Sequence, residues 1–273
     1  MSYNYCLGQL KMYKNIHFIC KSIELVTILK LNMLHKKILY SRKLTKILFC
    51  YLKDLFYMHY LDCKNLIVPF FTDKSCSGIV NNALWSNLKE LLTSLSYKNL
   101  FINVFGISKK FKKKYFVNTY VYTKYVIGNV YSLSDETVSF YVAFLLFKEV
   151  LFSNSHYFFL FFNEYIDIYY QVVNYYLLRS LNDFFNIFFF NGFDLSLIDL
   201  LTIYNIYFFF ISVILLDIIE CNMYSEYGSR ANSMSNSIQH AKENVLVFST
   251  LCNRYRQAKI TNSIIEIVSS LIH

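Results

Sequence analysis

The C-terminal part of the chain follows one regular spacing of apolar residues. Residues 227–255 read YGSRANSMSNSIQHAKENVLVFSTLCNRY. Apolar side chains recur here at alternating steps of four and three, at Tyr227, Ala231, Met234, Ile238, Ala241, Val245, Phe248, Cys252 and Tyr255. A repeat that lasts about four heptads predicts a long α-helix packed lengthwise against a partner helix. Neither glycine nor proline interrupts residues 229–273, so the helix is expected to continue to His273.

The N-terminal part carries a second long helical pattern. No glycine or proline lies between Gly8 and Pro69. Two runs alternate by four and three, and they comprise Ile16, Ile19, Ile23 and Val26, then Leu44, Leu48, Tyr51, Leu55 and Met58. We expect the two terminal helices to wind around each other, antiparallel if the segment between them folds as a compact domain.

The middle of the chain has a different period. Short apolar runs at 66–71, 100–105 and 156–162 predict strands, whereas 82–95 and 134–150 predict helices, the second capped by Ser134. Alternating strands and helices indicate a Rossmann-like α/β domain with a largely parallel sheet. The predicted fold class is therefore α/β, with an antiparallel coiled coil of residues 1–65 and 194–273 and a central domain of residues 66–193.

Charge and hydropathy restrict the partners. Residues 1–127 hold 20 Lys/Arg and 5 Asp/Glu, a balance of +15, while residues 128–273 hold 7 and 13, a balance of −6. A basic half favours an acidic protein, a nucleic acid or an anionic membrane surface. Residues 200–216 lack charge, but Asp199 and Asp217 bracket them, and 17 residues are few for a membrane span. We interpret them as a buried helix.

No catalytic, cofactor or metal constellation stands out. No two of the six glycines are closer than 22 residues, so no glycine-rich phosphate loop exists. His17 with Cys20, and His59 with Cys63, have helical spacing but no nearby third ligand. Two functions stay open from the residues alone: a coiled-coil scaffold, or a nucleic-acid-binding protein that uses the lysines of 109–114.

The polar residues of the C-terminal helix are more specific. Ser225-Glu226 precedes Arg230 and Met234, and Asn253-Arg254-Tyr255-Arg256-Gln257-Ala258-Lys259-Ile260-Thr261 is followed by Glu266-Ile267-Val268. This order and spacing closely resembles the C-terminal signature of the gamma subunit of F-type ATP synthases. Lys14-Asn15-Ile16 with 19–26, Thr72-Asp73-Lys74 with Gly78 and Asn81, and Phe162-Asn163-Glu164 are also similar to segments of that family.

The resemblance implies a central-stalk rotor subunit that is not itself catalytic and needs no cofactor. Its implied partners are the alpha and beta subunits, epsilon (or its delta equivalent) and the c-ring, without nucleic acid. The chain would lie peripherally on the inner face of an energy-transducing membrane, either a bacterial plasma membrane or a mitochondrial or plastid inner membrane. Implied contacts with beta subunits are Arg254, Arg256, Gln257, Thr261, Lys21 and Lys30. The implied apolar tip of the shaft consists of Ile260, Ile264, Ile267, Leu271 and Ile272.

Overall fold

The chain forms two compact units. The computed structural model describes residues 3–51, 65–72, 80–96, 102–104, 125–126, 143, 148, 156–167, 170–181 and 200–272. One unit, here called the terminal unit, combines Met1–Leu29 with Arg230–His273; the other, the sheet unit, is Lys30–Ser229. Helices α1 (Tyr3–Tyr51) and α7 (Leu200–Ile272) each contribute to both units.

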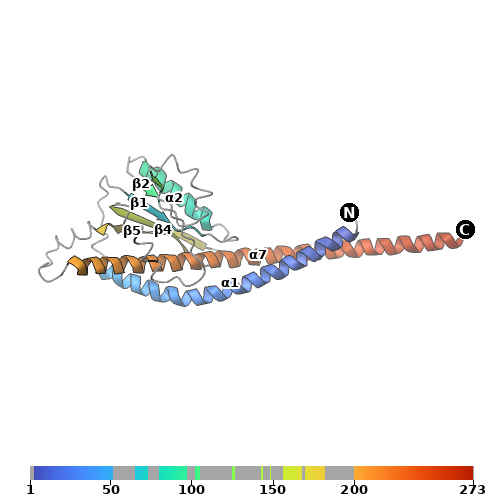
Figure 1. Cartoon of the computed structure of the whole chain (residues 1–273). Helices are drawn as coiled ribbons and strands as arrows, with labels where there is room; N and C mark the ends of the chain where they lie inside the picture. Colours follow the sequence, from blue (N-terminus) through green and yellow to red (C-terminus); the bar gives the residue numbers. More distant parts are fainter. Residues whose placement is uncertain are drawn as a thin grey trace. The chain divides into compact units, whose positions relative to one another are not determined.

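The sheet has five strands in the order β3-β2-β1-β4-β5 (Figure 1). They are β1 (Asn65–Pro69), β2 (Ile102–Val104), β3 (Tyr125–Val126), β4 (Tyr157–Asp167) and β5 (Tyr170–Arg179). The first four run parallel, and β5 pairs antiparallel with β4. The largely parallel sheet is confirmed, as are the strands expected at 66–71, 100–105 and 156–162. Strands β3 and β5 were not predicted, and the helix expected at 134–150 lies, apart from Ala143 and Lys148, outside the described residues.

Both faces of the sheet are covered. Along β1 the side chains alternate, as a pleated strand requires: Leu66 and Val68 join one core cluster and Ile67 joins the other. On the second face, helix α2 (Val80–Ser96) packs Leu84 and Leu88 against the sheet. On the first face lie residues of α1 and α7 that belong to the sheet unit (Figure 1).

Asn81, at the start of α2, bonds to Thr72, which lies three residues after the end of β1. Its side-chain Oδ1 accepts hydrogen bonds from the backbone N–H of Thr72 at 3.0 Å and from the Thr72 hydroxyl at 3.1 Å. Its Nδ2 donates to the Thr72 carbonyl at 3.0 Å. One amide thus satisfies three polar groups at the end of a strand, and this holds α2 against the sheet.

Within the sheet unit, α1 and α7 run antiparallel. Residues later in α1 contact residues earlier in α7. Lys30 Nζ lies 3.4 Å from the Tyr227 hydroxyl, whereas the Ser41 hydroxyl donates to Asp217 Oδ1 at 3.1 Å. The uncharged start of α7 is long and apolar enough to cross a membrane, yet 61% of its most apolar window is buried in the protein. Ile203, Phe210 and Ile214 of this stretch lie in the core beneath the sheet, as expected of a buried helix. Leu201, Ile206 and Phe209 are exposed, so the first turns of α7 are buried along one side only.

Within the terminal unit, the predicted seam of α7 is confirmed. Met234, Ile238, Ala241 and Cys252 are buried, and the intervening positions of the repeat are half-buried. The ring of Phe248 stacks on Tyr13 of α1, with centroids 5.5 Å apart. The apolar repeat therefore faces its partner helix, as four-three spacing predicts.

For most of its described residues, the seam predicted for α1 is wrong by one position. Ile16, Ile19, Ile23 and Val26 are exposed, whereas the facing positions are His17, Cys20, Glu24 and the buried Thr27. The same offset holds for Leu44 in the sheet unit, which is exposed while Ser41 and Thr45 are buried, but Leu48 packs against the core as predicted. The side chain of Tyr51 and the residues Leu55 and Met58 lie outside the described part of the chain. Polar side chains are tolerated on the inner side because the hydroxyls of Thr27, Ser41 and Thr45 bond to carbonyls one turn back in their own helix.

Candidate functional site: an exposed helix end and a buried polar network

The C-terminal turns of α7 are solvent-exposed over their whole circumference. Every residue from Arg256 to Leu271 is exposed, and Leu271 retains 79% of its surface. Of the predicted tip residues, Ile260, Ile264, Ile267 and Leu271 are all exposed. Ile272 belongs to the helix, but its side chain is outside the described part. An exposed apolar helix end needs a partner surface to cover it.

The residue types at the repeat positions show where the two-helix seam ends. Beyond Tyr255, the next positions of the four-three repeat are Lys259, Asn262 and Glu266, all polar and exposed. The apolar positions move instead to Ile260, Ile264, Ile267 and Leu271, which share one face at steps of four, three and four. The helix thus exchanges a face that packs on α1 for a face that is open to another molecule.

The predicted polar contact residues fall on two sides of this helix. Arg254, Gln257 and Thr261 are spaced by three and four and share one face, where the Thr261 hydroxyl donates to the Gln257 carbonyl at 3.0 Å. Arg256 lies four residues before Ile260 and so heads the apolar stripe. The helix end therefore presents an arginine in line with its apolar face and a polar face beside it.

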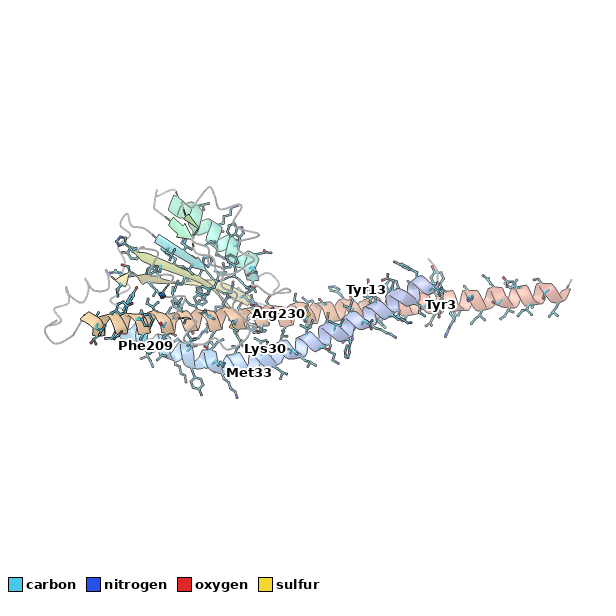
Figure 2. The ribbon with its side chains drawn as sticks, viewed as in Figure 1. Tyr3, Tyr13, Lys30, Met33, Phe209 and Arg230 are labelled. Carbon is cyan, nitrogen blue, oxygen red and sulfur yellow. The ribbon has the colours of Figure 1, made fainter. Side chains whose placement is uncertain are left out.

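The two predicted lysines have different surroundings. Lys21 is exposed on α1 in the terminal unit. Lys30 belongs to the sheet unit and is half-buried, with its ammonium 5.4 Å from the centroid of the Tyr227 ring (Figure 2). A cation held over a tyrosine ring is stabilised by the ring quadrupole, so Lys30 also has a structural role within its own unit.

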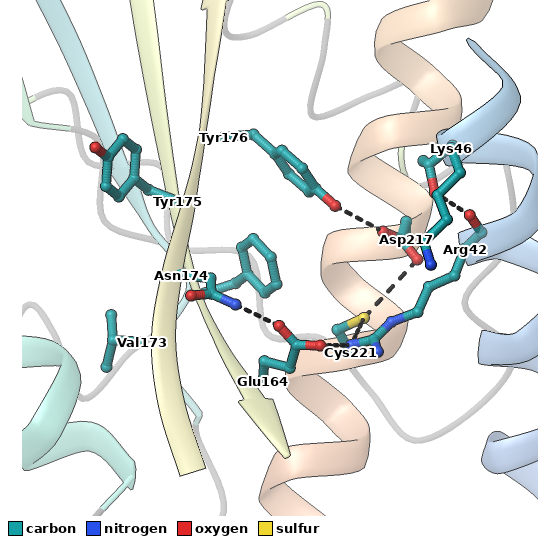
Figure 3. Close-up of a pocket in the computed structure, with 11 residues that line it drawn as sticks. Arg42, Lys46, Glu164, Val173, Asn174, Tyr175, Tyr176, Asp217 and Cys221 are labelled. Carbon is teal, nitrogen blue, oxygen red and sulfur yellow. Dashed lines mark hydrogen bonds and ion pairs between the residues drawn. The ribbon is translucent and has the colours of Figure 1, made fainter. Parts of the chain in front are cut away.

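A buried polar network centred on Asp217 was not predicted as a site. Asp217 is 1% exposed and lies on α7. Its carboxylate accepts hydrogen bonds from the Ser41 hydroxyl on α1 at 3.1 Å and from the Tyr176 hydroxyl on β5 at 3.4 Å. The Cys221 thiol, one turn along α7, donates weakly at 3.8 Å. One buried carboxylate therefore joins both helices to the sheet. Figure 3 shows its bonds to Tyr176 and Cys221.

Burial decides the electrostatics of this network. Desolvation raises the pKa of Asp217, and its hydrogen bond from Ser41 and the charge of Arg42 oppose that rise. Burial likewise raises the pKa of Glu220, one turn along the helix. The pKa of the Cys221 thiol is raised to about 12, chiefly by burial and then by the charge of Asp217. The thiol is therefore protonated at neutral pH and is not a nucleophile.

A cavity of about 570 Å³ borders the network. Arg42 of α1 forms an ion pair with Glu164 of β4, and its guanidinium also donates to Cys221 Sγ at 3.5 Å. Glu164 accepts a second hydrogen bond from Asn174 Nδ2 on β5 (Figure 3). The polar groups that line the cavity bond mainly to one another, which is typical of a structural joint rather than of a ligand site. Among the described residues, no group of three or more His, Cys, Asp or Glu is placed so that it could hold a metal ion.

A second amide pair strengthens the same joint. Asn222 of α7 accepts hydrogen bonds at its Oδ1 from Asn163, from the backbone N–H at 3.3 Å and from the side-chain Nδ2 at 3.1 Å. The sequence marked Asn163 only as part of the segment Phe162-Asn163-Glu164 that is similar to the family, without a role for its side chain. The one available signal for the network was the pair of carboxylates at Asp217 and Glu220, which follow 17 uncharged residues and so had to be buried or to mark a helix end.

Comparisons with known proteins agree with this architecture. The model of the family described as ATP synthase matches residues 6–271, so the chain belongs to the ATP synthase family. Within that family, the part that it resembles is the gamma subunit, as the signature around Arg256 predicted. No curated protein sequence matches the chain.

Solved structures share the fold. A chain of the Euglena gracilis mitochondrial ATP synthase (OSCP/F1/c-ring, rotational state 3) has a TM-score of 0.74 and 18% identity, with 99% of this chain and 93% of that chain covered. A rotor chain of the same enzyme in rotational state 1 has a TM-score of 0.72 and 18% identity, with 94% and 98% covered. A chain of the Tetrahymena thermophila mitochondrial central stalk and c-ring has a TM-score of 0.60 and 19% identity, with 80% and 98% covered.

Proposed function

We propose that this chain is the gamma subunit of an F-type ATP synthase, the rotor of its central stalk. The observation that carries the proposal is the family match over residues 6–271 together with the exposed helix end that follows the two-helix seam. The similar structures come from F1, rotor and central-stalk assemblies, which supports alpha, beta, epsilon and the c-ring as partners. Proton flow through the ring would turn this chain.

Nucleotide chemistry belongs to the partners in this proposal. The chain has no glycine-rich phosphate loop, and its buried Asp217 carboxylate and Cys221 thiol are engaged in structural hydrogen bonds. Its contribution is mechanical and electrostatic. Packed helices transmit torque, and an asymmetric surface opens and closes the catalytic sites of a surrounding ring in turn.

The exposed end of α7 supplies the surface for this role. Ile260, Ile264, Ile267 and Leu271 form an apolar stripe that suits a sleeve of apolar side chains, within which a shaft can turn without fixed bonds. Arg256, at the head of the stripe, and the polar face of Arg254, Gln257 and Thr261 would bind loops of beta subunits at chosen angles. Lys21 would face an acidic segment of a beta subunit. Lys30 would also face such a segment while its ammonium keeps its contact with the Tyr227 ring.

The assembled complex would place the chain peripherally at an energy-transducing membrane, on its inner face. Contacts between exposed lysines or arginines and acidic loops are screened by salt, since they lie at the surface. Weak, salt-sensitive contacts fit a rotor, because a shaft that binds strongly at one angle cannot leave it.

The Arg256→Ala variant tests the proposal. The purified complex that contains it should pump fewer protons per ATP hydrolysed, while the helix content and thermal stability of the chain stay unchanged, because Arg256 is exposed. Lys259→Ala is the matched control, since Lys259 is also an exposed cation, one turn away and off the apolar stripe.

Two outcomes would contradict the proposal. One is a chain that does not co-purify with alpha and beta subunits. The other is a pumping ratio for Arg256→Ala equal to that of Lys259→Ala and of the unchanged chain.

A further inference from the structure

The outward face of α1 in the sheet unit repeats a coiled-coil pattern. Met33, Lys37, Tyr40, Leu44 and Ile47 follow one another at steps of four, three, four and three. All five are exposed, with 67% of the surface of Met33 and 75% of that of Tyr40 accessible. Figure 2 shows the Met33 side chain pointing away from the neighbouring helix α7. We call this set the outer seam.

The outer seam is distinct from the seam that packs on α7. The inward positions of α1 lie one residue later in sequence and include Leu34, Ile38, Ser41 and Thr45, which are buried. One residue corresponds to about 100° around a helix. The helix therefore has two adjacent heptad faces, of which α7 covers one, and this is the pattern of a helix with two helical neighbours.

Charge beside the outer seam indicates what kind of helix fits. In heptad terms the seam residues are a and d positions, and the g positions beside them are Lys36 and Lys43, both exposed. Lys37 occupies an a position, where a lone polar residue fixes register. Residues 30–51 contain six Lys or Arg and no Asp or Glu. A partner helix with Asp or Glu at its e positions would form ion pairs with these two lysines.

We propose that the outer seam binds an acidic amphipathic helix of another polypeptide, which lies along Met33–Ile47 for about two heptads. The contact would be about 22 Å long at 1.5 Å per residue. Two heptads bind weakly on their own, so the contact depends on the partner being held in the same complex at high effective concentration. This proposal goes beyond the rotor role, which uses the end of α7 together with Lys21 and Lys30 of α1 and none of the outer-seam residues.

Photocrosslinking in the assembled complex tests it. Tyr40 is replaced by p-benzoyl-phenylalanine in the full chain, the complex is purified and irradiated, and the adduct is mapped by mass spectrometry. The expected product joins position 40 to a helical segment of another subunit that is rich in Asp and Glu. Leu39, exposed and about 100° away from the seam, is the matched control position and should give little adduct with that segment.

A charge-reversal variant tests whether Lys36 and Lys43 attract an acidic partner helix. In the background with the photoreactive residue at position 40, Lys36→Glu/Lys43→Glu should lower the adduct yield roughly fivefold or more, because two attractive pairs become repulsive. Lys89→Glu, at an exposed position of α2 in the same unit, should leave the yield unchanged.

Four results would overturn the proposal: an adduct with lipid, an adduct within this chain, no adduct, or equal yields from positions 39 and 40. Because the assay only requires an assembled complex, a negative result here leaves the Arg256 test of the rotor role unaffected. A chain that fails to assemble with alpha and beta subunits counts against the rotor role instead.

Discussion

The ring of Tyr165 occupies the space where Gly228 would otherwise carry a side chain. A Cβ atom at Gly228 would overlap the ring of Tyr165, with Cδ2 at 2.5 Å and Cε2 closer still. The same ring meets Tyr224 edge-on, with centroids 5.2 Å apart. The absence of a side chain in the middle of α7 therefore lets the end of β4 pack directly on the helix backbone.

Gly228→Ala should destabilise the chain even though alanine is the better helix former. The new methyl group displaces a packed ring, at a cost of about 1–3 kcal/mol, while the helix preference returns only about 1 kcal/mol. The free energy of unfolding in guanidinium is the measurement. Gly8→Ala is the matched control, because nothing lies within 4 Å of its Cβ position, and it should stabilise α1. Adding Tyr165→Leu to Gly228→Ala should recover part of the loss; equal stabilisation by both alanines would contradict the steric account.

The buried carboxylate of Asp217 makes stability depend on pH in a stated direction. Burial raises the pKa of Asp217 in the folded chain above the ordinary value of 3.8, which applies to the unfolded chain. At a pH between the unfolded-state pKa and the folded-state pKa, the folded chain therefore binds more protons than the unfolded chain. The free energy of unfolding should therefore fall as pH rises through that window. Asp217→Asn should flatten this slope, and adding Glu220→Gln should flatten it further, because burial raises that pKa too.

Denaturant midpoints measured from pH 4 to 8 provide the check on the Asp217 prediction. Glu266→Gln, an exposed carboxyl on the same helix, serves as control and should leave the slope unchanged. A slope that survives in the variant lacking both Asp217 and Glu220 would show that other groups set it.

The apolar stripe at the end of α7 should contribute to binding the alpha/beta ring. Ile264→Gln/Ile267→Gln removes two exposed isoleucines without changing their helical positions. Burial of each is worth roughly 1–2 kcal/mol, so the affinity for purified alpha/beta ring should fall about tenfold or more. Asn262→Gln/Ser269→Gln, on the opposite face, should bind normally. Fluorescence titration of labelled chain with the ring measures both, and equal affinities would remove the stripe from the interface.

The sequence predicted the larger features because each has its own periodic signal. The four-three repeat from Tyr227 to Tyr255 identified the buried face of α7, and the apolar runs identified three parallel strands. The face of α1 was assigned one residue early, because Ile16, Ile19, Ile23 and Val26 are more apolar than the residues that face α7. An apolar seam is evidence of some partner, and here that partner is not α7.

The missed parts are those that depend on pairing across the fold. Strand β5 has half-buried positions on both faces, so it lacks the strict alternation by which strands are recognised. The network of Ser41, Tyr176 and Asp217 joins residues more than 40 positions apart, which no local spacing encodes. The roles of Arg254, Arg256, Gln257, Thr261, Lys21 and Lys30 came from family resemblance, and they stay predictions.

The change of residue type after Tyr255 has a mechanical meaning. Up to Tyr255, bending α7 also strains the side chains that pack against α1, so the packed pair of helices is stiffer than a single helix. Past it, from Lys259 to Leu271, only the helix's own hydrogen bonds oppose bending, and the last turns are the softer part of the terminal unit. A load applied to Arg256 is therefore taken up where stiff and compliant segments meet, and an elastic element is built into the chain at the place where it is proposed to contact the ring.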